Sequence, residues 1–177
     1  MKILKYFLLG IAGIIVLVLI IAAFVSNSYT LQKEVTINKP AMDIYNYVRI
    51  NKNQTDWNAW YKMDTKAKID ITGTDGEVGS AWNWDSEITG KGNQTIAALE
   101  PGTKIAYELN FIKPFEAKAN NDVTFEALDS THTIVRNTFI GNSPYPMNVM
   151  HLFMNMDKMM GTPMQDGLNA IKANMEK

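Results

Sequence analysis

The sequence predicts an α+β protein in which one long apolar helix precedes a single domain of strands and helices. Three observations lead to this class: a 20-residue run without charge at residues 6–25, seven strand-like segments after it, and an amphipathic helix at the end of the 177-residue chain. About 150 residues follow the run, which is enough for one domain with a sizeable core. We therefore expect a membrane anchor with a short linker at residues 1–28 and one domain at residues 29–177.

The apolar run, Tyr6 to Val25, has the length of a membrane-spanning helix, and Lys2 and Lys5 precede it. At about 1.5 Å per residue it spans about 30 Å, the thickness of the hydrocarbon core of a bilayer. A cleaved signal peptide is the alternative, but its apolar region is usually only about 7–15 residues long. No polar face interrupts the run, which argues against a buried core helix. The length of the run and the weak cleavage signal after it, at residues 26–28, favour an uncleaved single-pass anchor in the cell membrane. The lysines before the run favour a cytoplasmic N-terminus and an extracytoplasmic domain.

The composition of the domain excludes several classes of function. Apart from Lys2 and Lys5, 15 basic residues stand against 18 acidic ones without a basic run, so we expect no nucleic-acid partner. The chain has no cysteine, which excludes disulfides, thiolate nucleophiles and zinc–thiolate sites. HExxH, a phosphate-binding glycine loop with its lysine, and GxSxG are all absent. We expect no metal and no cofactor, and we interpret His132 and His151 as surface residues.

The elements of the domain are predicted in a simple order. Residues 29–37 alternate like a strand, and Lys39-Pro40 then begins a helix. A second, short helical piece is expected at residues 57–61. Turn signals then separate six further predicted strands, at residues 66–72, 80–85, 92–100, 104–112, 115–127 and 131–141.

Two of these strands indicate which side chains point inward. From Ile105 to Phe111 the odd positions are apolar and the even ones small or polar, which predicts one buried face and one wet face. The next strand keeps this parity, so Phe115, Ala117 and Ala119 are expected to point inward. A face packed only for stability would prefer bulky branched side chains. The small inward alanines therefore suggest a hollow.

The tail of the chain is predicted to be helical in two pieces. The first piece covers residues 147–160, and Gly161 ends it. Thr162 is then expected to be the N-cap of the final helix, with Gln165 completing a capping box.

One face of the final helix is apolar and carries Met164, Leu168, Ile171 and Met175. This stripe would pack against a concave sheet. Eight of the 11 methionines lie at or beyond Met147. Because methionine adapts to irregular apolar spaces, they could serve either as ordinary core filling or as the lining of a ligand site.

The last two strands, paired as a hairpin around Asp129, place two amides on the inner face. If Val135 and Phe139 face inward, Asn121 lies opposite Asn137. These amides could orient a hydroxyl or carbonyl group of an apolar ligand. They could also bond each other or a buried water.

Five stretches of the chain carry a family resemblance: EVTINKP at residues 34–40, WNAWY at 57–61, GTDGEVG at 73–79, FIKPF at 111–115 and NSPYP at 142–146. With the order of the elements, residues 29–175 resemble the SRPBCC superfamily, which has the START and birch-pollen-allergen helix-grip fold, and in particular its bacterial polyketide cyclase/dehydrase-like branch. The resemblance implies a curved antiparallel sheet wrapped around a long C-terminal helix. It also implies an apolar cavity between them, as in members that bind lipids, sterols or polyketides. The superfamily has no universal catalytic residue, so the resemblance assigns none here.

The residues that we expect to line this cavity come from the strands and from the final helix. They are Trp82, Trp84, Tyr107, Leu109, Ala117, Ala119, Asn121, Asn137, Met164 and Leu168. The tryptophans and the tyrosine among them could equally be core or rim residues.

The function that we expect is binding of a small hydrophobic molecule, either a lipid or a polyketide-like compound, by a membrane-anchored protein. Residues 26–28 are a very short linker, which would hold the domain at the membrane. Two alternatives remain open. One is a cyclase/dehydrase-type enzyme that acts in the same cavity, and the other is a packed scaffold that binds another protein. The sequence identifies no protein partner.

Overall fold

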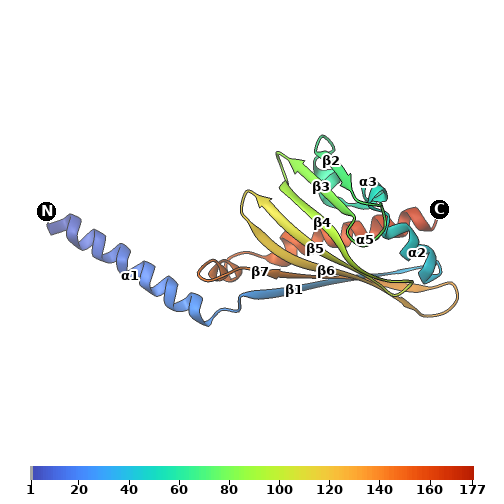
Figure 1. The fold of residues 1–177 in the computed structure, drawn as a ribbon. Helices are drawn as coiled ribbons and strands as arrows, with labels where there is room; N and C mark the ends of the chain where they lie inside the picture. Colours follow the sequence, from blue (N-terminus) through green and yellow to red (C-terminus); the bar gives the residue numbers. More distant parts are fainter. Residues whose placement is uncertain (1) are drawn as a thin grey trace.

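The computed structural model describes residues 2–177 (Figure 1). Helix α1 (Lys2–Phe24) projects from the folded body, and residues 25–27 connect it to the first strand. Within the described chain, this is the one helix that is long and apolar enough to cross a membrane. Ala22 is the only buried residue among those described in it. The apolar side chains of α1 therefore take almost no part in the core of the body.

Seven antiparallel strands form one curved sheet. They are β1 (Ser28–Ile37), β2 (Lys68–Thr72), β3 (Ala81–Ser86), β4 (Gly90–Glu100), β5 (Lys104–Lys113), β6 (Ala117–Ala127) and β7 (Thr133–Asn142). Their order in the sheet is β1-β7-β6-β5-β4-β3-β2, so β1 pairs with the last strand and the others pair with their neighbours in sequence. The seven strands predicted from the sequence are confirmed, each with bounds within two residues of the expected ones.

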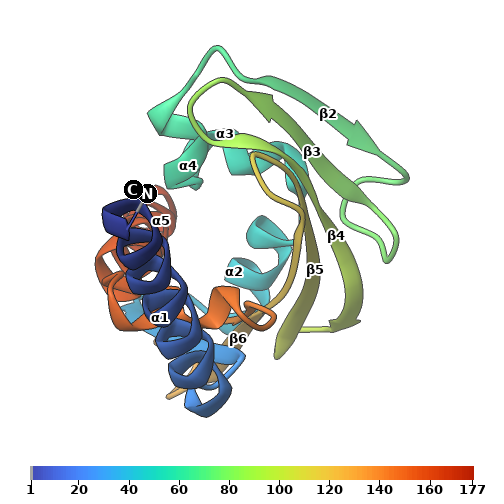
Figure 2. The ribbon, with the colours of Figure 1, turned by 90° about the vertical axis from the view of Figure 1, so that its left-hand side faces the viewer.

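The helices of the body, that is, all except α1, lie on the concave side of the sheet. The longest one in the body is α5 (Thr162–Met175), near the C-terminus. Three short helices, α2 (Ala41–Val48), α3 (Gln54–Trp57) and α4 (Ala59–Met63), together with the 3₁₀ turn η1 (Asn51–Asn53), connect β1 to β2. Figure 2 shows β2 to β6 as an arc with these helices and α5 inside it. The predicted α+β class, with a curved sheet wrapped around a C-terminal helix, is thus confirmed.

The apolar stripe of α5 anchors this helix in the core. Met164, Leu168 and Ile171 are all buried, and Leu168 and Ile171 belong to the main cluster of core residues. Burial of a side chain of this size contributes about 1.5–3 kcal/mol. Met175 packs against the same cluster and is partly buried. The stripe predicted from the sequence is therefore what holds α5 against the sheet.

The alternation predicted for β5 and β6 fails at one end of this hairpin. Ile105, Tyr107 and Ala119 are buried as expected, but Phe115 is 76% exposed and Ala117 is exposed too. The reason is that β6 begins only at Ala117, so that Phe115 lies in the turn before it. At this end of the sheet the inner side is open, and alternation no longer indicates burial.

The helical tail also differs from its prediction. It consists of the 3₁₀ segment η2 (Met147–Leu152), four further residues, and the π-helical turn η3 (Asp157–Gly161), which continues directly into α5. Gly161 has ordinary helical angles, φ −65° and ψ −38°, and therefore ends nothing. A Cβ at Gly161 would lie 2.5 Å from Asp157 Oδ1 and 2.8 Å from Lys33 Cε, so the glycine leaves room for the ion pair of these two side chains, which links η3 to β1.

The predicted capping box at the start of α5 is likewise wrong. The residue that precedes the helix is Gly161, which has no side chain with which to cap it. The Gln165 side chain donates instead to the backbone carbonyl of Glu34, at 3.3 Å, and to Asn169 Oδ1, at 3.2 Å. It thereby ties α5 to β1 instead of closing a cap.

Candidate functional site

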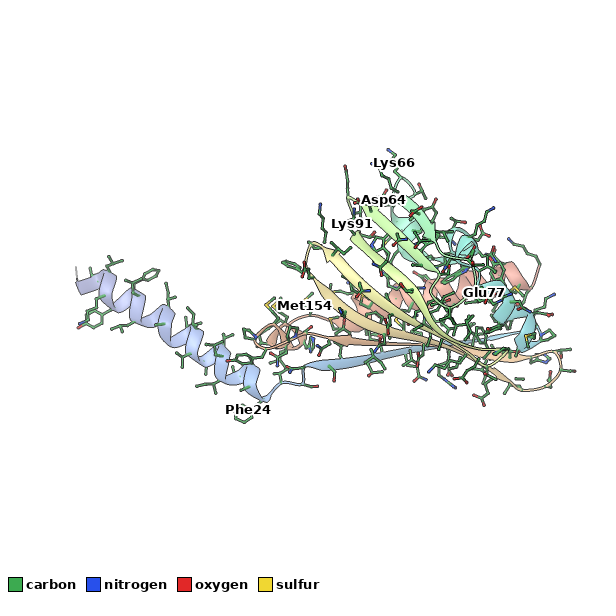
Figure 3. The ribbon with its side chains drawn as sticks, viewed as in Figure 1. Phe24, Asp64, Lys66, Glu77, Lys91 and Met154 are labelled. Atoms are coloured by element: carbon green, nitrogen blue, oxygen red, sulfur yellow. The ribbon has the colours of Figure 1, made fainter. Side chains whose placement is uncertain are left out.

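A cavity of about 370 Å³ lies between the concave face of the sheet and the helices α3, α4 and α5. Its wall is mostly aliphatic and aromatic, with contributions from strands β2 to β7. Pockets that hold small molecules usually measure about 300–1,000 Å³. In Figure 3 the labelled Lys66 and Lys91 point outward from the body, away from this space. The domain thus encloses an apolar space of a size suited to a ligand.

Eight of the ten residues expected from the sequence line this cavity. They are Trp82, Trp84, Tyr107, Leu109, Asn121, Asn137, Met164 and Leu168. The two alanines are not among the lining residues. Ala117 is exposed at the open end of the sheet, whereas Ala119 is covered by a small cluster that includes Phe139 and Met164. The hollow that these alanines suggested is therefore bounded by larger side chains beside them.

Several aromatic residues of the wall were missed by the sequence reasoning. Trp57, Trp60 and Tyr61 come from α3 and α4, and Phe111 and Phe139 come from the sheet. Trp60 and Tyr61 follow Trp57 by three and four residues, a spacing that would place all three on one side of a continuous helix. In the structure the extended residue Asn58 separates α3 from α4. The spacing of the aromatic residues was the available signal, but without the fold it did not show that the segment closes over the sheet.

A buried chain of amides holds this aromatic segment in place. Asn51 Nδ2 donates to Ser80 Oγ at 2.8 Å, and Gln54 Nε2 donates to Asn51 Oδ1 at 3.0 Å. Asn58 Nδ2 then donates to Gln54 Oε1 at 3.0 Å. Asn58 Oδ1 accepts the backbone N–H groups of Trp60 and of the next residue, as the N-cap of α4. The network fixes α3 and α4 relative to β3, and with them one wall of the cavity.

The two inward amides lie in a different register from the predicted one. Asn121 pairs with Phe139, and Asn137 pairs with Val123, so that the strands are shifted by two residues relative to the expectation. A shift of two residues keeps every side chain on its face of the sheet. Asn121 and Asn137 therefore both line the cavity, but they are not directly opposite each other.

Two polar atoms of wall residues are buried without a partner in the described part of the chain. They are the side-chain oxygen of Asn137 and the indole nitrogen of Trp57. A buried polar group without a hydrogen bond costs about 1–3 kcal/mol. One of these atoms is an acceptor and the other a donor, so a ligand with a hydroxyl group could satisfy either of them.

Tyr107 is poorly suited to acid–base chemistry. Burial raises its pKa well above the ordinary value for tyrosine, and its hydroxyl group donates to the backbone carbonyl of Val48 at 3.5 Å. The other ionisable side chain among the lining residues is that of Tyr61. The wall, as the structure describes it, contains no carboxylate, amine, guanidinium or imidazole.

The two histidines lie outside the cavity. His132 is in the turn between β6 and β7, next to Asp129. Hydrogen bonds from Thr131 and His132 hold the pKa of the Asp129 carboxyl group well below its usual range. His151 belongs to η2, packs edge-on against Tyr29 at 4.9 Å, and shares a hydrogen bond with a serine hydroxyl group. These contacts are those of structural residues.

Comparison with known proteins identifies related folds only. No family model and no curated protein matches the chain. Norcoclaurine synthase from Thalictrum flavum, a point mutant in complex with a transition-state analogue, aligns with a TM-score of 0.64 at 11% identity over 84% of this chain and 94% of that one. A protein from Thermobifida fusca aligns with a TM-score of 0.62 at 15% identity, over 82% of this chain and 92% of that one.

A third solved structure is the di-domain ARO/CYC protein StfQ from the steffimycin biosynthetic pathway. It aligns with a TM-score of 0.63 at 11% identity, over 84% of this chain and 51% of that one. These likenesses show that the chain has the helix-grip fold that the resemblance seen in the sequence implied. At such low identity they concern the fold and not the activity.

Proposed function

We propose that this chain is a membrane-anchored protein that binds a small hydrophobic molecule in the cavity between the sheet and α5. The observation that carries the proposal is the cavity itself, with its apolar wall and without a charged group among the described lining residues. Transfer of apolar surface from water into such a space contributes about 25 cal/mol per Å². An apolar ligand is therefore the occupant that this wall favours.

The polar atoms of the wall support a ligand that is not purely hydrocarbon. Asn137 offers a free acceptor and Trp57 a free donor, and Asn121 lies in the same wall. A few placed polar groups in an apolar pocket usually orient the ligand. We infer a molecule with one or a few hydroxyl or carbonyl groups, of the kind found in lipids, isoprenoids and polyketides.

The exposed helix α1 supports a location at the membrane. Its apolar side chains are almost all exposed, and residues 25–27 separate it from β1. Three residues reach at most about 10 Å. The body would thus stay beside the bilayer, where a hydrophobic molecule can be taken up or delivered. Lys2 and Lys5 lead us to propose a cytoplasmic N-terminus and an extracytoplasmic body.

The two alternative functions have less support. Acid–base catalysis needs a group of suitable pKa within reach of the substrate. The described wall offers only two tyrosines for this role, and the pKa of Tyr107 is raised. A packed scaffold is disfavoured because densely packed interiors have few voids larger than a water molecule.

The test is native mass spectrometry of residues 28–177, purified from membrane-containing cells, followed by extraction of any bound molecule. Both clusters of core residues consist of residues after α1, so this fragment retains the core. We expect a lipid-like or polyketide-like molecule at one copy per chain. An empty protein that also fails to bind an apolar fluorescent probe would contradict the proposal.

Gly167, which lines the cavity from α5, offers a matched pair of variants. A Cβ at this position would lie 3.5 Å from the Trp57 carbonyl oxygen, which is an ordinary contact. Gly167→Ala should therefore keep the bound molecule, whereas Gly167→Leu should fill part of the cavity and lose it. Equal retention by both variants would place the molecule elsewhere on the protein.

A further inference from the structure

The segment that follows β7 is fastened to the end of α1. Asn148, in η2, is fully buried, and its Nδ2 lies 2.8 Å from the carbonyl oxygens of both Ala22 and Val25. The same nitrogen lies 2.9 Å from Asn27 Oδ1. The last carbonyls of a helix lack partners within the helix. Asn148 therefore donates to carbonyls at the end of α1, one of which, that of Ala22, also accepts the backbone N–H of Val25, and it fixes η2 beside the helix.

A second contact shows how far this segment extends along α1. The hydroxyl group of Tyr145 lies 3.4 Å from the backbone carbonyl oxygen of Leu19. Leu19 precedes the last residue of α1, Phe24, by five positions, which corresponds to about 7.5 Å along the helix. The segment thus reaches back past the end of α1, toward the part of the helix that would lie inside a bilayer.

The composition of this segment fits a bilayer surface better than water. The segment, residues 143–156, contains no aspartate, glutamate, lysine or arginine, and this uncharged stretch already begins at residue 137 within β7. Met147, Met150 and Leu152 are nevertheless exposed, and Phe153 is 79% exposed. Contiguous exposed apolar side chains on a soluble protein usually mark a binding surface. Figure 3 shows Met154, within this segment, on the side of the body from which α1 leaves.

The turn between β5 and β6 lies at the end of the sheet where α1 meets β1. Because the strands are antiparallel and β1 starts where α1 ends, the turns β3–β4 and β5–β6 lie at this end of the sheet (Figure 1). The first of these turns carries the exposed Ile88, and the second carries the exposed Phe115. Ile88 also lines the cavity, as does the exposed Met159, so the cavity opens at this end.

We propose that these side chains form an apolar rim that dips into the bilayer leaflet beside α1. The rim consists of Phe115, Tyr145, Met147, Met150, Leu152 and Phe153. This proposal rests on the proposed membrane anchoring. A rim at this position would place the open end of the cavity, at Ile88 and Met159, against lipid. The bilayer is the occupant that the geometry favours, because the contacts of Asn148 and Tyr145 set the rim level with the last turns of α1.

The test uses the full chain, which contains no cysteine and therefore accepts single labels. Phe153→Cys carries an environment-sensitive fluorophore, and the protein is reconstituted into phosphatidylcholine vesicles with or without lipids that bear a nitroxide quencher. Leu128→Cys, exposed at the opposite end of the sheet, is the matched control. Leu152→Cys repeats the measurement at a second position of the rim.

We expect the labels at residues 152 and 153 to be quenched several-fold more strongly than the label at residue 128. Equal, weak quenching at all three positions, in protein that floats with the vesicles, would overturn the rim and leave the anchor intact. A blue-shifted label that lipid does not quench would indicate contact with protein, such as a second copy, and would also overturn the rim. Protein that fails to float would refute both the rim and the anchor, whereas ligand binding is judged separately by the Gly167 pair.

Discussion

Replacement of Asn137 by leucine should make the empty protein more stable and the binding site weaker. The side-chain oxygen of Asn137 is buried in the cavity wall without a hydrogen bond from the described residues. Leucine has a similar size and no polar atom, so it removes the unpaired acceptor. Removal of such a group should stabilise the empty domain by about 1–3 kcal/mol.

This free energy corresponds to a measurable shift of the unfolding temperature. For a domain of this size, 1 kcal/mol shifts Tm by about 2–4 °C. If the ligand donates a hydrogen bond to this oxygen, its loss should weaken binding by about 1 kcal/mol, or about fivefold. The predicted signature is therefore a higher Tm together with a lower affinity.

The assay is thermal unfolding of the delipidated domain, followed by titration with the molecule found in the cavity. Asn120→Leu is the matched control, because Asn120 is exposed and lies beside Asn121 on the outer face of β6. A surface substitution of this kind should change stability by less than about 0.5 kcal/mol. A lower Tm for Asn137→Leu would contradict this prediction, since the oxygen would then have a partner such as an ordered water.

Gln54→Leu should destabilise the domain by about 2–3 kcal/mol in urea unfolding, because it leaves the buried amide of Asn51 and the half-buried amide of Asn58 without their partner. Hydrogen bonds lower the folded pKa of Asp129, so their contribution to stability is fully present above the unfolded pKa of about 4 and is lost as the pH falls from there through the folded pKa. Asp129→Asn should therefore reduce stability at pH 7, and its difference from the wild type should fade in acid. Binding of a neutral apolar probe should not change between about pH 5 and pH 9, because the described wall has no group that titrates there; a steep change would reveal an ionisable group in the site. If the body is extracytoplasmic, Ser130→Cys in intact cells should react with a membrane-impermeant maleimide, and protection of this cysteine would contradict the proposed orientation.

Local patterns were sufficient for most of the fold, because each strand had to present one face to the core. Alternation placed Ile105, Tyr107 and Val123 on the inner side correctly. The same pattern could not show where the cover of the sheet ends, so Phe115 was assigned to the core although it lies in an open turn. Alternation indicates to which side of the sheet a side chain points, whereas its burial depends on which other elements pack on that side.

The candidate site was predictable only in part, for a related reason. The face of Asn121 and Asn137 was correct, but their register was wrong by two residues, since a shift of two leaves the pattern of inward and outward side chains unchanged. Gly161 was interpreted as a helix stop, although its missing side chain leaves room for the ion pair between Lys33 and Asp157. A glycine has the same appearance in sequence for either role.

The apolar rim is the feature that local sequence patterns could least predict. Residues 137–156 are as free of charged side chains as the run that predicted α1, yet prolines and asparagines interrupt them, so they do not qualify as a spanning helix. Their position beside α1 depends on the hydrogen bond between Asn148 and Ala22, two residues that are 126 positions apart. Only the fold brings the end of a membrane-length helix and an uncharged loop to the same level. The combination of the two, and neither of them alone, is what supports the proposal that the body touches lipid.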